Sequence, residues 1–259
     1  MHRIVLVTGG GNGLGKAVAA RFAADGDTVF ITGRSAGRVA DAAAEMGAKP
    51  VPADATDPRQ VARMAVDLGD DLDVLVNMAG GNTDFVTADS AADADSAADA
   101  AAADGAGQSL AELERVAAAW RANLDANLLS AVLTTTAVLG KLRTGGAIVN
   151  VGSIGAEYAS TSYGAAKAAL AAWTAGLSAE VGPRGVTANV ISPGYIAETD
   201  FFRGRLTDER KARLIGATHN GRAGQPADIA ETAYFLASAG ARHITGQTLH
   251  VNGGAHTTR

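Results

Sequence analysis

Short apolar segments alternate with longer segments of mixed polarity along most of the chain. The short segments are rich in Val and Ile, whereas the longer ones are rich in alanine and place apolar residues at helical spacing. Near-continuous apolar strands are typical of a parallel sheet that is buried on both faces. The predicted strands are residues 3–8, 28–33, 73–80, 146–153, 185–192 and 247–251, with a further short strand at 49–53.

Helical patterns separate these strands, as in LGKAVAARFAADG, AGRVADAAAEMG and PRQVARMAVDLG. Strands that alternate with helices favour parallel pairing through right-handed crossovers. The expected fold class is therefore α/β, with a single Rossmann-type, doubly wound parallel sheet flanked by helices on both faces. The length of the chain suits one domain over residues 1–259.

Two regions break this alternation. Residues 87–109 are a low-complexity run of Ala, Asp and Ser without a large apolar residue. We expect a mobile surface insertion, partly helical, that either lies near a ligand at the preceding strand end or is inert.

Residues 194–225 form a second irregular region, in which Phe201 and Phe202 stand between polar stretches. A loop at this place can close over a ligand bound at the strand ends.

Composition narrows the possible environments and partners. The chain has no cysteine, a net charge of −5 and no basic stripe, which argues against secretion and against a nucleic-acid partner. No signal-peptide pattern follows Met1, and no apolar run is long enough for a bilayer, so a cytoplasmic protein without membrane contact is expected. We expect no metal site, because the histidines lack paired ligand spacing; they are His2, His219, His243, His250 and His256.

A glycine-rich turn, VTGGGNGLG, joins the first predicted strand to the first long helix. Thr8, Gly9, Gly13 and Gly15 have the spacing T-G-x-x-x-G-x-G. Glycine lets the backbone approach a ligand closely, and the free amides at a helix start attract an anion such as a dinucleotide pyrophosphate. The alternative is a tight strand-to-helix turn that binds nothing.

The second predicted strand ends in ITGRS, with Gly33 followed by Arg34. Many dinucleotide folds place an acidic residue here to bind the ribose 2′-hydroxyl. Arg34 can instead make charge-assisted hydrogen bonds to a 2′-phosphate, which favours NADP(H) over NAD(H). The alternative is an ordinary solvated arginine.

Candidate proton-transfer residues lie in the second half of the chain. Tyr163 and Lys167 are helix neighbours in SYGAAKAALAAW, and a nearby ammonium would lower the pKa of a phenol and make it a useful general acid or base. Ser153 ends a predicted strand, where its hydroxyl can bond a substrate oxygen. Asn127, in ANLLSAV, can hold a water in a proton relay. A chance Tyr–Lys pair and an asparagine merely tolerated in a helix are the alternatives.

Taken together, these motifs make nearly the whole chain resemble the short-chain dehydrogenase/reductase family, and within it members like 3-oxoacyl-ACP reductase. Asn127, Ser153, Tyr163 and Lys167 match the catalytic tetrad of this family. Further matching motifs are TGGGNGLG (8–15), DATD (54–57), NMAG (77–80), SPGYI (192–196) and HITGQTLHVNGG (243–254), with Met78 where the family has a second asparagine.

The resemblance implies roles for the tetrad. Tyr163 would exchange a proton with the substrate oxygen, and Ser153 would orient that oxygen. Lys167 would contact the ribose and depress the pKa of Tyr163. Asn127 would support a water that connects Lys167 to solvent.

The resemblance also implies the cofactor contacts. Asp54 would bind the adenine, Asn77 would brace the turn near Thr8, and the role of Thr199 stays open because PGYIAET carries an extra residue. The implied contacts are Thr8, Gly9, Gly11, Asn12, Gly13, Leu14, Gly15, Arg34, Ser35, Asp54, Ala55, Asn77, Ala79, Gly80, Tyr163, Lys167, Pro193, Gly194 and Ile196.

The function we expect is that of an NADP(H)-dependent oxidoreductase, which transfers hydride between the nicotinamide and a ketone or secondary alcohol. The alternatives are an NAD-dependent secondary-alcohol dehydrogenase and a dinucleotide-sensing protein without catalysis. Tyr195, Phe201 and Phe202 either line an apolar substrate pocket or serve packing. The resemblance further implies a homo-oligomer, a tetramer or a dimer, and the helices around 110–140 and 160–180 are its expected interfaces.

Overall fold

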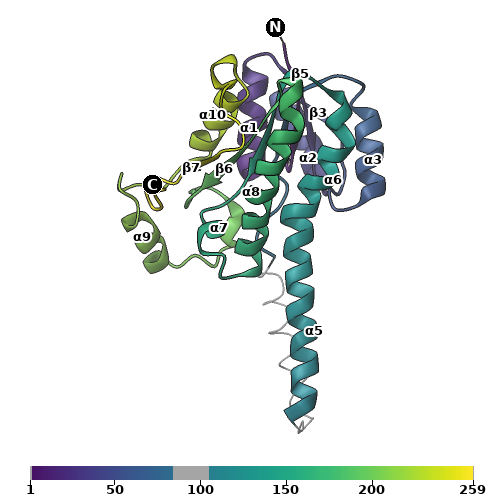
Figure 1. Cartoon of the computed structure of the whole chain (residues 1–259). Coiled ribbons are helices and arrows are strands. Elements are labelled where there is room, and N and C mark those ends of the chain that lie inside the picture. Colours follow the sequence, from purple (N-terminus) through teal and green to yellow (C-terminus); the bar gives the residue numbers. More distant parts are fainter. Residues whose placement is uncertain (1, 84–104, 259) are drawn as a thin grey trace.

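In a computed structural model of the chain, residues 2–83 and 105–258 are described, and seven parallel strands form one sheet in the order β3-β2-β1-β4-β5-β6-β7 (Figure 1). The order reverses between β1 and β4, which is where open α/β sheets bind ligands beyond the carboxyl ends of their strands. The predicted fold class is confirmed. The strands are β1 (Ile4–Thr8), β2 (Thr28–Thr32), β3 (Lys49–Pro50), β4 (Leu72–Asn77), β5 (Leu142–Val151), β6 (Thr187–Pro193) and β7 (Thr248–Val251).

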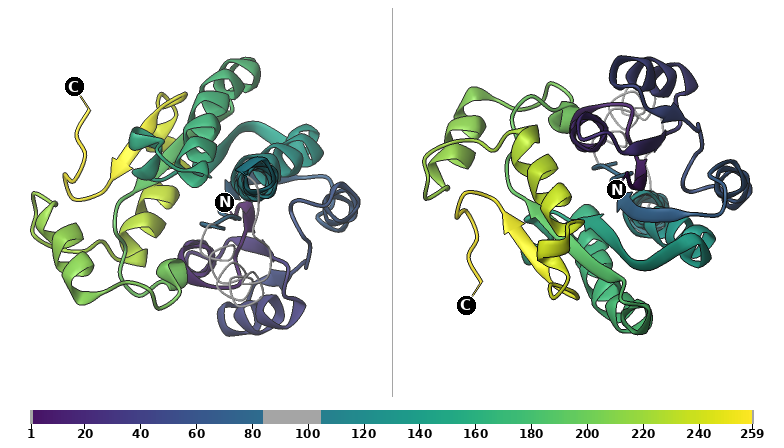
Figure 2. Two further views of the ribbon diagram at one scale, coloured as in Figure 1. Left: turned by 90° about the horizontal axis from the view of Figure 1, so that it is seen from below. Right: turned by 90° about the horizontal axis from the view of Figure 1, so that it is seen from above.

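Helices cover both faces of the sheet (Figure 2). One face carries α1 (Gly13–Ala24), α2 (Ala36–Met46) and α10 (Pro226–Leu236), and the other carries α3 (Pro58–Asp67), α6 (Ser130–Val138) and α8 (Ser162–Val181). The remaining helical segments are α5 (Gly105–Leu124), a π-helical turn η1 (Asp125–Leu129), α7 (Gly155–Tyr158), α9 (Asp208–Gly216) and the short 3-10 turns η2 (Leu139–Lys141), η3 (Gly182–Arg184), η4 (Asp200–Phe202) and η5 (Ala239–Ala241).

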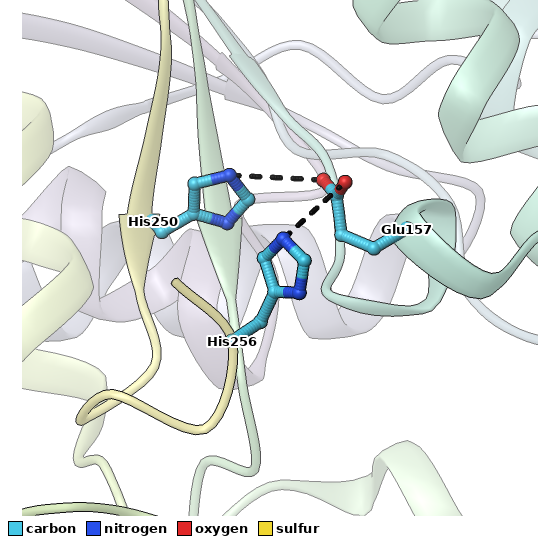
Figure 3. Close-up of side chains that lie close together, drawn as sticks. All are labelled: Glu157, His250 and His256. Atoms are coloured by element: carbon cyan, nitrogen blue, oxygen red, sulfur yellow. Dashed lines mark ion pairs between the residues drawn. The ribbon is translucent and has the colours of Figure 1, made fainter. Parts of the chain in front are cut away.

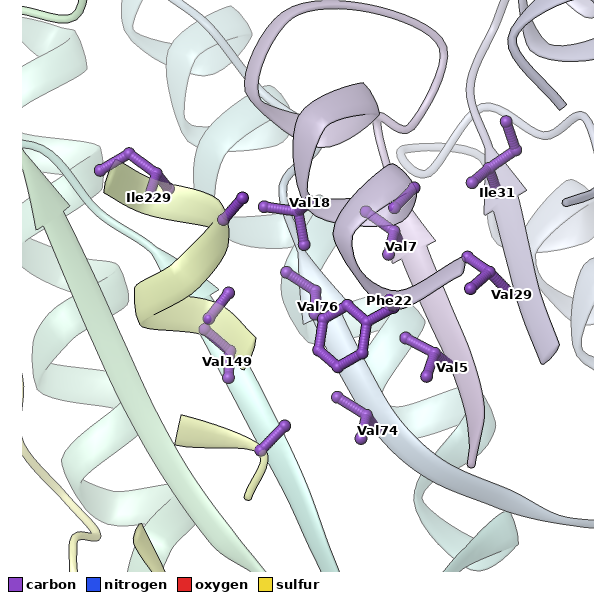
Figure 4. Close-up of a cluster of buried hydrophobic side chains, with 14 of the residues drawn as sticks. Val5, Val7, Val18, Phe22, Val29, Ile31, Val74, Val76, Val149 and Ile229 are labelled. Atoms are coloured by element: carbon purple, nitrogen blue, oxygen red, sulfur yellow. The ribbon is translucent and has the colours of Figure 1, made fainter. Parts of the chain in front are cut away.

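The alternation of side chains along each strand divides the core into two clusters. In β1, Val5 and Val7 face one set of helices while Leu6 faces the other, as the pleat of a strand requires. The first cluster centres on Phe22 of α1, which is fully buried among valines of β1, β2 and β4 (Figure 4). Both faces of the sheet are therefore dry, which explains why the strands read as continuous apolar runs.

The two irregular regions of the sequence have different outcomes. Of the predicted insertion at 87–109, residues 87–104 lie outside the described residues, and α5 begins at the end of the insertion and projects from the body of the molecule (Figure 1). The region 194–225 is more helical than expected, because it contains η4 and α9. Helix α9 begins where the Thr207 hydroxyl accepts a hydrogen bond from Arg210 N and two acidic residues occupy the first turn.

Within the described ranges 2–83 and 105–258, none of the helices combines the length and hydrophobicity that a bilayer-spanning segment requires.

Truncation of Phe22 should cost far more stability than truncation of an exposed side chain. Phe22→Ala leaves a cavity under α1 and should lower the free energy of unfolding by about 3–5 kcal/mol in urea denaturation followed by circular dichroism. Val66→Ala, at a side chain that is 75% exposed, is the matched control and should change it by less than about 0.5 kcal/mol. Equal losses in the two variants would show that the core is not centred on Phe22.

Candidate active site

The predicted catalytic side chains gather beyond the carboxyl ends of the central strands. Ser153 follows β5 directly, Tyr163 and Lys167 lie on α8, and Asn127 lies in the π-helical turn η1 between α5 and α6. Tyr163, Lys167 and Asn127 are buried, at 9%, 5% and 1% exposure, and Ser153 is half-buried. The structure therefore brings together polar side chains from elements that are distant in the sequence.

The Ser153 hydroxyl lies next to the phenol of Tyr163, close enough to lower its pKa. The Ser153 Oγ already accepts a hydrogen bond of 3.1 Å from Gly155 N, which leaves its own proton free to be donated. Helix α8 starts next to this pair because the Thr161 side chain caps it by accepting from Gly164 N. Gly164 is needed here, since a Cβ at this position would lie 2.6 Å from the Gly155 carbonyl oxygen.

Burial controls the acidity of Tyr163. It raises the pKa of the phenol to about 12, and the hydrogen bond with Ser153 offsets only part of this effect. The ring of Phe201 covers the phenol, with 5.6 Å between ring centroids, and Phe202 and Tyr195 extend the aromatic cluster. In the protein alone, Tyr163 is therefore a protonated group over the whole neutral range.

Lys167 donates a hydrogen bond of 2.7 Å to the carbonyl oxygen of Val151, and burial lowers its pKa to about 8. Its Nζ lies 5.9 Å from the centroid of the Tyr163 ring. The sequence-based expectation that Lys167 lowers the pKa of Tyr163 is not met by the chain itself. The reason is that the ammonium points to a backbone carbonyl, so desolvation dominates the titration of both groups.

Asn127 is held rigidly by backbone groups. Its Nδ2 donates to the carbonyl oxygens of Gly81 and Asn123, each at 3.0 Å, and its Oδ1 accepts from Gly81 N at 2.9 Å. The π-helical turn lets the side chain reach the segment after β4. Asn127 therefore fastens that segment to the helix that packs against α8.

Asn123, one helical turn before Asn127, was not among the predicted site residues. Its Nδ2 donates a buried hydrogen bond of 2.8 Å to Ser162 Oγ, next to Tyr163, and its Oδ1 accepts from Thr83 N. The spacing of two asparagines four residues apart on one helix is the sequence signal that could have identified it.

The glycine turn has the close approaches that its sequence predicts. Gly9 has a φ of +69°, and a Cβ there would lie 3.1 Å from the backbone of Ala79. A Cβ on Gly15 would overlap the carbonyl oxygen of Gly9. Helix α1 starts at Gly13 without a side-chain cap from Asn12, whereas side chains cap α3, α8 and α9. The first amides of α1 are therefore available to an anion.

A buried polar network connects this turn to α8. The Thr8 hydroxyl accepts hydrogen bonds of 3.0 Å from Met78 N and Ala79 N, and it is therefore Thr8 that braces the turn after β4. Asn77 Nδ2 donates to Asn150 Oδ1 at 2.8 Å, and Asn150 Nδ2 donates to Thr174 Oγ1 on α8 at 2.8 Å.

The expected role of Asn77 as the brace near Thr8 stays a prediction, and its side-chain hydrogen bonds run elsewhere. Its side chain is buried and bonds Thr135 Oγ1 and Asn150 instead, because strand alternation turns it toward α6. Only the backbone of Asn77 shares a strand-pair position with Thr8, and no side-chain contact to a ligand in the crevice follows from this arrangement.

The adenine end of the predicted site is exposed and polar. Arg34 and Ser35 lie at the exposed start of α2, and within the described residues Arg34 makes no ion pair or hydrogen bond. Asp54 uses Oδ1 to accept from Thr56, whereas its Oδ2 has no hydrogen bond in the described chain. Arg38, which sequence reasoning did not single out, lies one turn after Arg34 and borders the glycine turn at Gly11.

The segment after β6 lies beside the segment after β5 that carries Ser153. Gly194 packs so closely that a Cβ would lie 2.8 Å from Asn252, and the Pro193 carbonyl accepts a hydrogen bond from Ile154 N beside Ser153. Ile196 is buried, and Thr199 Oγ1 donates to its carbonyl oxygen at 3.2 Å. Among the other predicted cofactor contacts, Leu14 and Ala55 pack toward the interior. Gly80 has a φ of +144° and faces Asn127.

The doubly wound sheet, with a glycine turn after β1 and a cluster of polar side chains beyond β5, defines the class as a Rossmann-type α/β protein. Residues 3–210 match the family described as short chain dehydrogenase. The chain belongs to the short-chain dehydrogenase/reductase family and is an oxidoreductase.

Relatives and solved structures agree with this assignment. The 3-oxoacyl-[acyl-carrier-protein] reductase FabG of Vibrio harveyi is 32% identical over 264 residues, covering 98% of this chain and 97% of the relative. The FabG protein of Escherichia coli is 32% identical over 265 residues, with the same coverage. Among solved structures, a blue fluorescent protein from a metagenomic library in complex with NADPH has a TM-score of 0.77 at 31% identity, with 98% of each chain covered.

A second solved structure that resembles this chain is itself a 3-oxoacyl-[acyl-carrier protein] reductase. The 3-oxoacyl-[acyl-carrier protein] reductase of Brucella melitensis has a TM-score of 0.80 at 28% identity, covering 99% of this chain and 92% of that one. The predicted resemblance to 3-oxoacyl-ACP reductases is therefore confirmed.

The titration of Lys167 should be visible in the stability of the protein without any cofactor. Between pH 8 and about 10, the unfolded chain holds a proton that the folded Lys167 has released, so the free energy of unfolding should rise with pH. The raised pKa of Tyr163 acts in the opposite sense, but only above about pH 10.

Relative to Lys167→Met, the wild-type protein should gain about 1.4 kcal/mol per pH unit in this window, measured by urea denaturation. A variant at the exposed Lys211, Lys211→Met, should follow the wild type. Parallel pH profiles for the wild type and Lys167→Met would contradict a depressed pKa.

Proposed function

We propose that the protein is an NADP(H)-dependent oxidoreductase that interconverts a ketone and a secondary alcohol, with Tyr163 as the general acid and base. The observation that carries the proposal is the Ser153 hydroxyl next to the buried phenol of Tyr163, with Lys167 one helical turn further, in a fold that also leaves the start of α1 uncapped. Neither an inert fold nor a simple binding protein requires this pair.

The residues of the crevice fit a dinucleotide. The close packing at Gly9 and Gly15 lets backbone amides approach a pyrophosphate, and the uncapped amides of α1 would bind its charge. The free Oδ2 of Asp54 can accept from an adenine amino group. The blue fluorescent protein whose solved structure contains NADPH supports this assignment, because it shares the fold and 31% of the aligned sequence with this chain.

Arg34 supports a preference for NADP(H). It is exposed, it has no carboxylate partner in the described part of the chain, and Gly33 places no negative charge at the end of β2. A guanidinium in this position can bond a ribose 2′-phosphate through two N–H groups. Arg38, one turn later, adds a second positive charge on the same side of α2.

The chain's own groups would perform the proton transfer. When bound, the cofactor would supply the hydride that reduces the carbonyl carbon of the substrate. Ser153 donates its free proton in a hydrogen bond to the carbonyl oxygen, and Tyr163 delivers a proton to that oxygen as its charge develops. Because burial keeps the phenol protonated, Tyr163 is a proton donor at the start of the reduction.

Lys167 has a supporting role in this proposal. Its ammonium is protonated below about pH 8, and because it donates to the Val151 carbonyl and does not lower the pKa of Tyr163, we assign it to the ribose hydroxyls of the cofactor. Reversal of these steps oxidises an alcohol, with the phenolate as base.

The homo-oligomer expected from the sequence is also a proposal. Helix α5 exposes four large apolar side chains within one arc of its surface: Leu110, Leu113, Val116 and Trp120. Such a continuous apolar stripe is typical of a surface that another chain covers. A second copy of this chain is the partner that the symmetry of most oligomers favours.

Removal of the phenol hydroxyl should abolish turnover while the cofactor still binds. Tyr163→Phe should lower kcat for NADPH-dependent ketone reduction by about 10²–10⁴-fold, because the proton donor is lost. The dissociation constant for NADPH, measured by fluorescence titration, should change by less than about threefold.

Tyr158→Phe is the matched control, since Tyr158 is 65% exposed and loses the same hydroxyl. It should keep the wild-type kcat. Near-normal turnover in Tyr163→Phe would remove this residue from the mechanism, and no turnover of any ketone by the wild type would favour the sensing alternative.

Charge exchange at the end of β2 should reverse the cofactor preference. The double variant Gly33→Asp/Arg34→Val should raise the KM for NADPH by at least about tenfold and lower the KM for NADH, because a carboxylate repels a 2′-phosphate and accepts from a 2′-hydroxyl. The substitution at Gly33 is sterically feasible, since a Cβ there would meet only the Val39 side chain, at 3.2 Å.

The control for this experiment is Arg115→Ala, which removes an exposed arginine on the distant helix α5 and should leave both KM values unchanged. A ratio of kcat/KM for the two cofactors that stays the same in the double variant would instead support the NAD-dependent alternative.

A further inference from the structure

A cluster of two histidines and a glutamate lies beside the active site and takes no part in the proposed reaction. Glu157 lies on α7, in the segment between Ser153 and Tyr163. His250 lies on β7, and His256 lies in the segment that follows it (Figure 3). The fold therefore brings together side chains that the sequence spacing did not connect.

The spacing of the three side chains is compatible with ligands of one metal ion. His250 Nε2 lies 3.7 Å from Glu157 Oε1, and His256 Nε2 lies 3.6 Å from Glu157 Oε2. Both distances exceed the range of about 2.7–3.2 Å for an N–H···O hydrogen bond. Ligand atoms on a tetrahedral zinc ion with bonds of about 2.0–2.1 Å lie about 3.4 Å apart. One ligand atom from each of the three side chains lies within 4.8 Å of the others.

The charge of the cluster also suits a cation. Among the described residues, Glu157 has no ion pair with a lysine or arginine. The side chains that face its carboxylate are the two imidazoles. Two neutral imidazoles and one carboxylate form a ligand set with a charge of −1. This combination of ligands is the one that zinc and similar divalent metals favour in proteins.

The three residues are held in place by their backbones before any ion binds. Glu157 N donates to the Ile154 carbonyl within α7, and His250 is paired with Ser192 of β6 in the sheet. Asn252 Nδ2 donates to the His256 carbonyl oxygen at 3.1 Å, which fixes the turn after β7. The side chains retain access to solvent, with exposed fractions of 29% for Glu157, 12% for His250 and 25% for His256.

We propose that Glu157, His250 and His256 bind one divalent transition-metal ion of the zinc type, with water at the remaining position. The ion would link α7 to β7 and to the C-terminal segment that follows β7. Its affinity should be moderate, because His250 Nδ1 is buried without a hydrogen-bond partner in the described chain and so lacks the supporting contact that tight metal sites have. The proposal departs from the sequence-based expectation of no metal, which rested on spacing along the chain alone.

The test uses the full-length protein, purified with an affinity tag that contains no histidine and stripped of metal with a chelator. Titration calorimetry with Zn²⁺ should give one site per chain with a dissociation constant on the order of micromolar. Co²⁺ should develop the strong visible absorption of a four-coordinate ion. Excess Zn²⁺ should raise the Tm of the wild type, because the ion binds the folded state.

Glu157→Gln and His256→Gln should each weaken Zn²⁺ binding by at least about tenfold and remove the shift in Tm. His243→Gln removes an exposed histidine outside the cluster and should bind Zn²⁺ like the wild type. A metal-free Tm equal to that of the wild type would show that each variant is folded.

Absence of saturable Zn²⁺ binding in the wild type would overturn the proposal and leave the cluster as an ion pair. Binding that survives in the Glu157→Gln/His256→Gln double variant, or that is lost equally in His243→Gln, would also overturn it. None of these measurements uses NADPH or turnover, so failure here is separate from failure of the proposed function.

Discussion

A chain of buried hydrogen bonds across the carboxyl edge of the sheet holds the whole site in register. Thr8, Asn77 and Asn150 occupy equivalent positions on three neighbouring strands. Thr8 receives the backbone of the turn after β4, Asn77 bonds Asn150, and Asn150 bonds Thr174 on α8. Asn77 Oδ1 has no hydrogen-bond partner in the described chain, but sliding of one strand against the next would leave the other buried amides of the network unpaired as well, so the network resists it.

This register fixes the distance between the two halves of the candidate site. The glycine turn leaves β1 immediately after Thr8, and Ser153 leaves β5 shortly after Asn150. Helix α8, anchored through Thr174, carries Tyr163 back to Ser153. A cofactor bound at the turn would therefore present its reactive end to the hydroxyl pair without any large movement of the scaffold. The same close packing buries Tyr163 and Lys167. Burial raises the pKa of Tyr163 and lowers the pKa of Lys167.

The sequence predicts the parts of this arrangement that depend on local patterns. Apolar runs predicted the strands, because both faces of the sheet are buried, and even the short β3 continues its hydrogen bonds through Val51 and Ala53 as the predicted range 49–53 requires. Glycine spacing predicted the turn because only glycine tolerates the approach of Gly15 to Gly9. The tetrad positions follow from motif spacing, although their catalytic roles and the cytoplasmic location stay predictions.

What the sequence could not predict depends on side-chain direction and on long-range contacts. Motif spacing named Asn77 but could not show that its side chain turns toward α6, and it named Lys167 but not the carbonyl to which its ammonium points. The cover over Tyr163 has the same origin: Phe201 comes from the segment after β6, whose turns carry no periodic pattern. The phenol that the proposed reaction would use is only 9% exposed, and Phe201 packs against it. Under the proposed function, substrate selection would depend on the segment after β6, whereas the sheet and its hydrogen-bond network would position the proton-transfer groups.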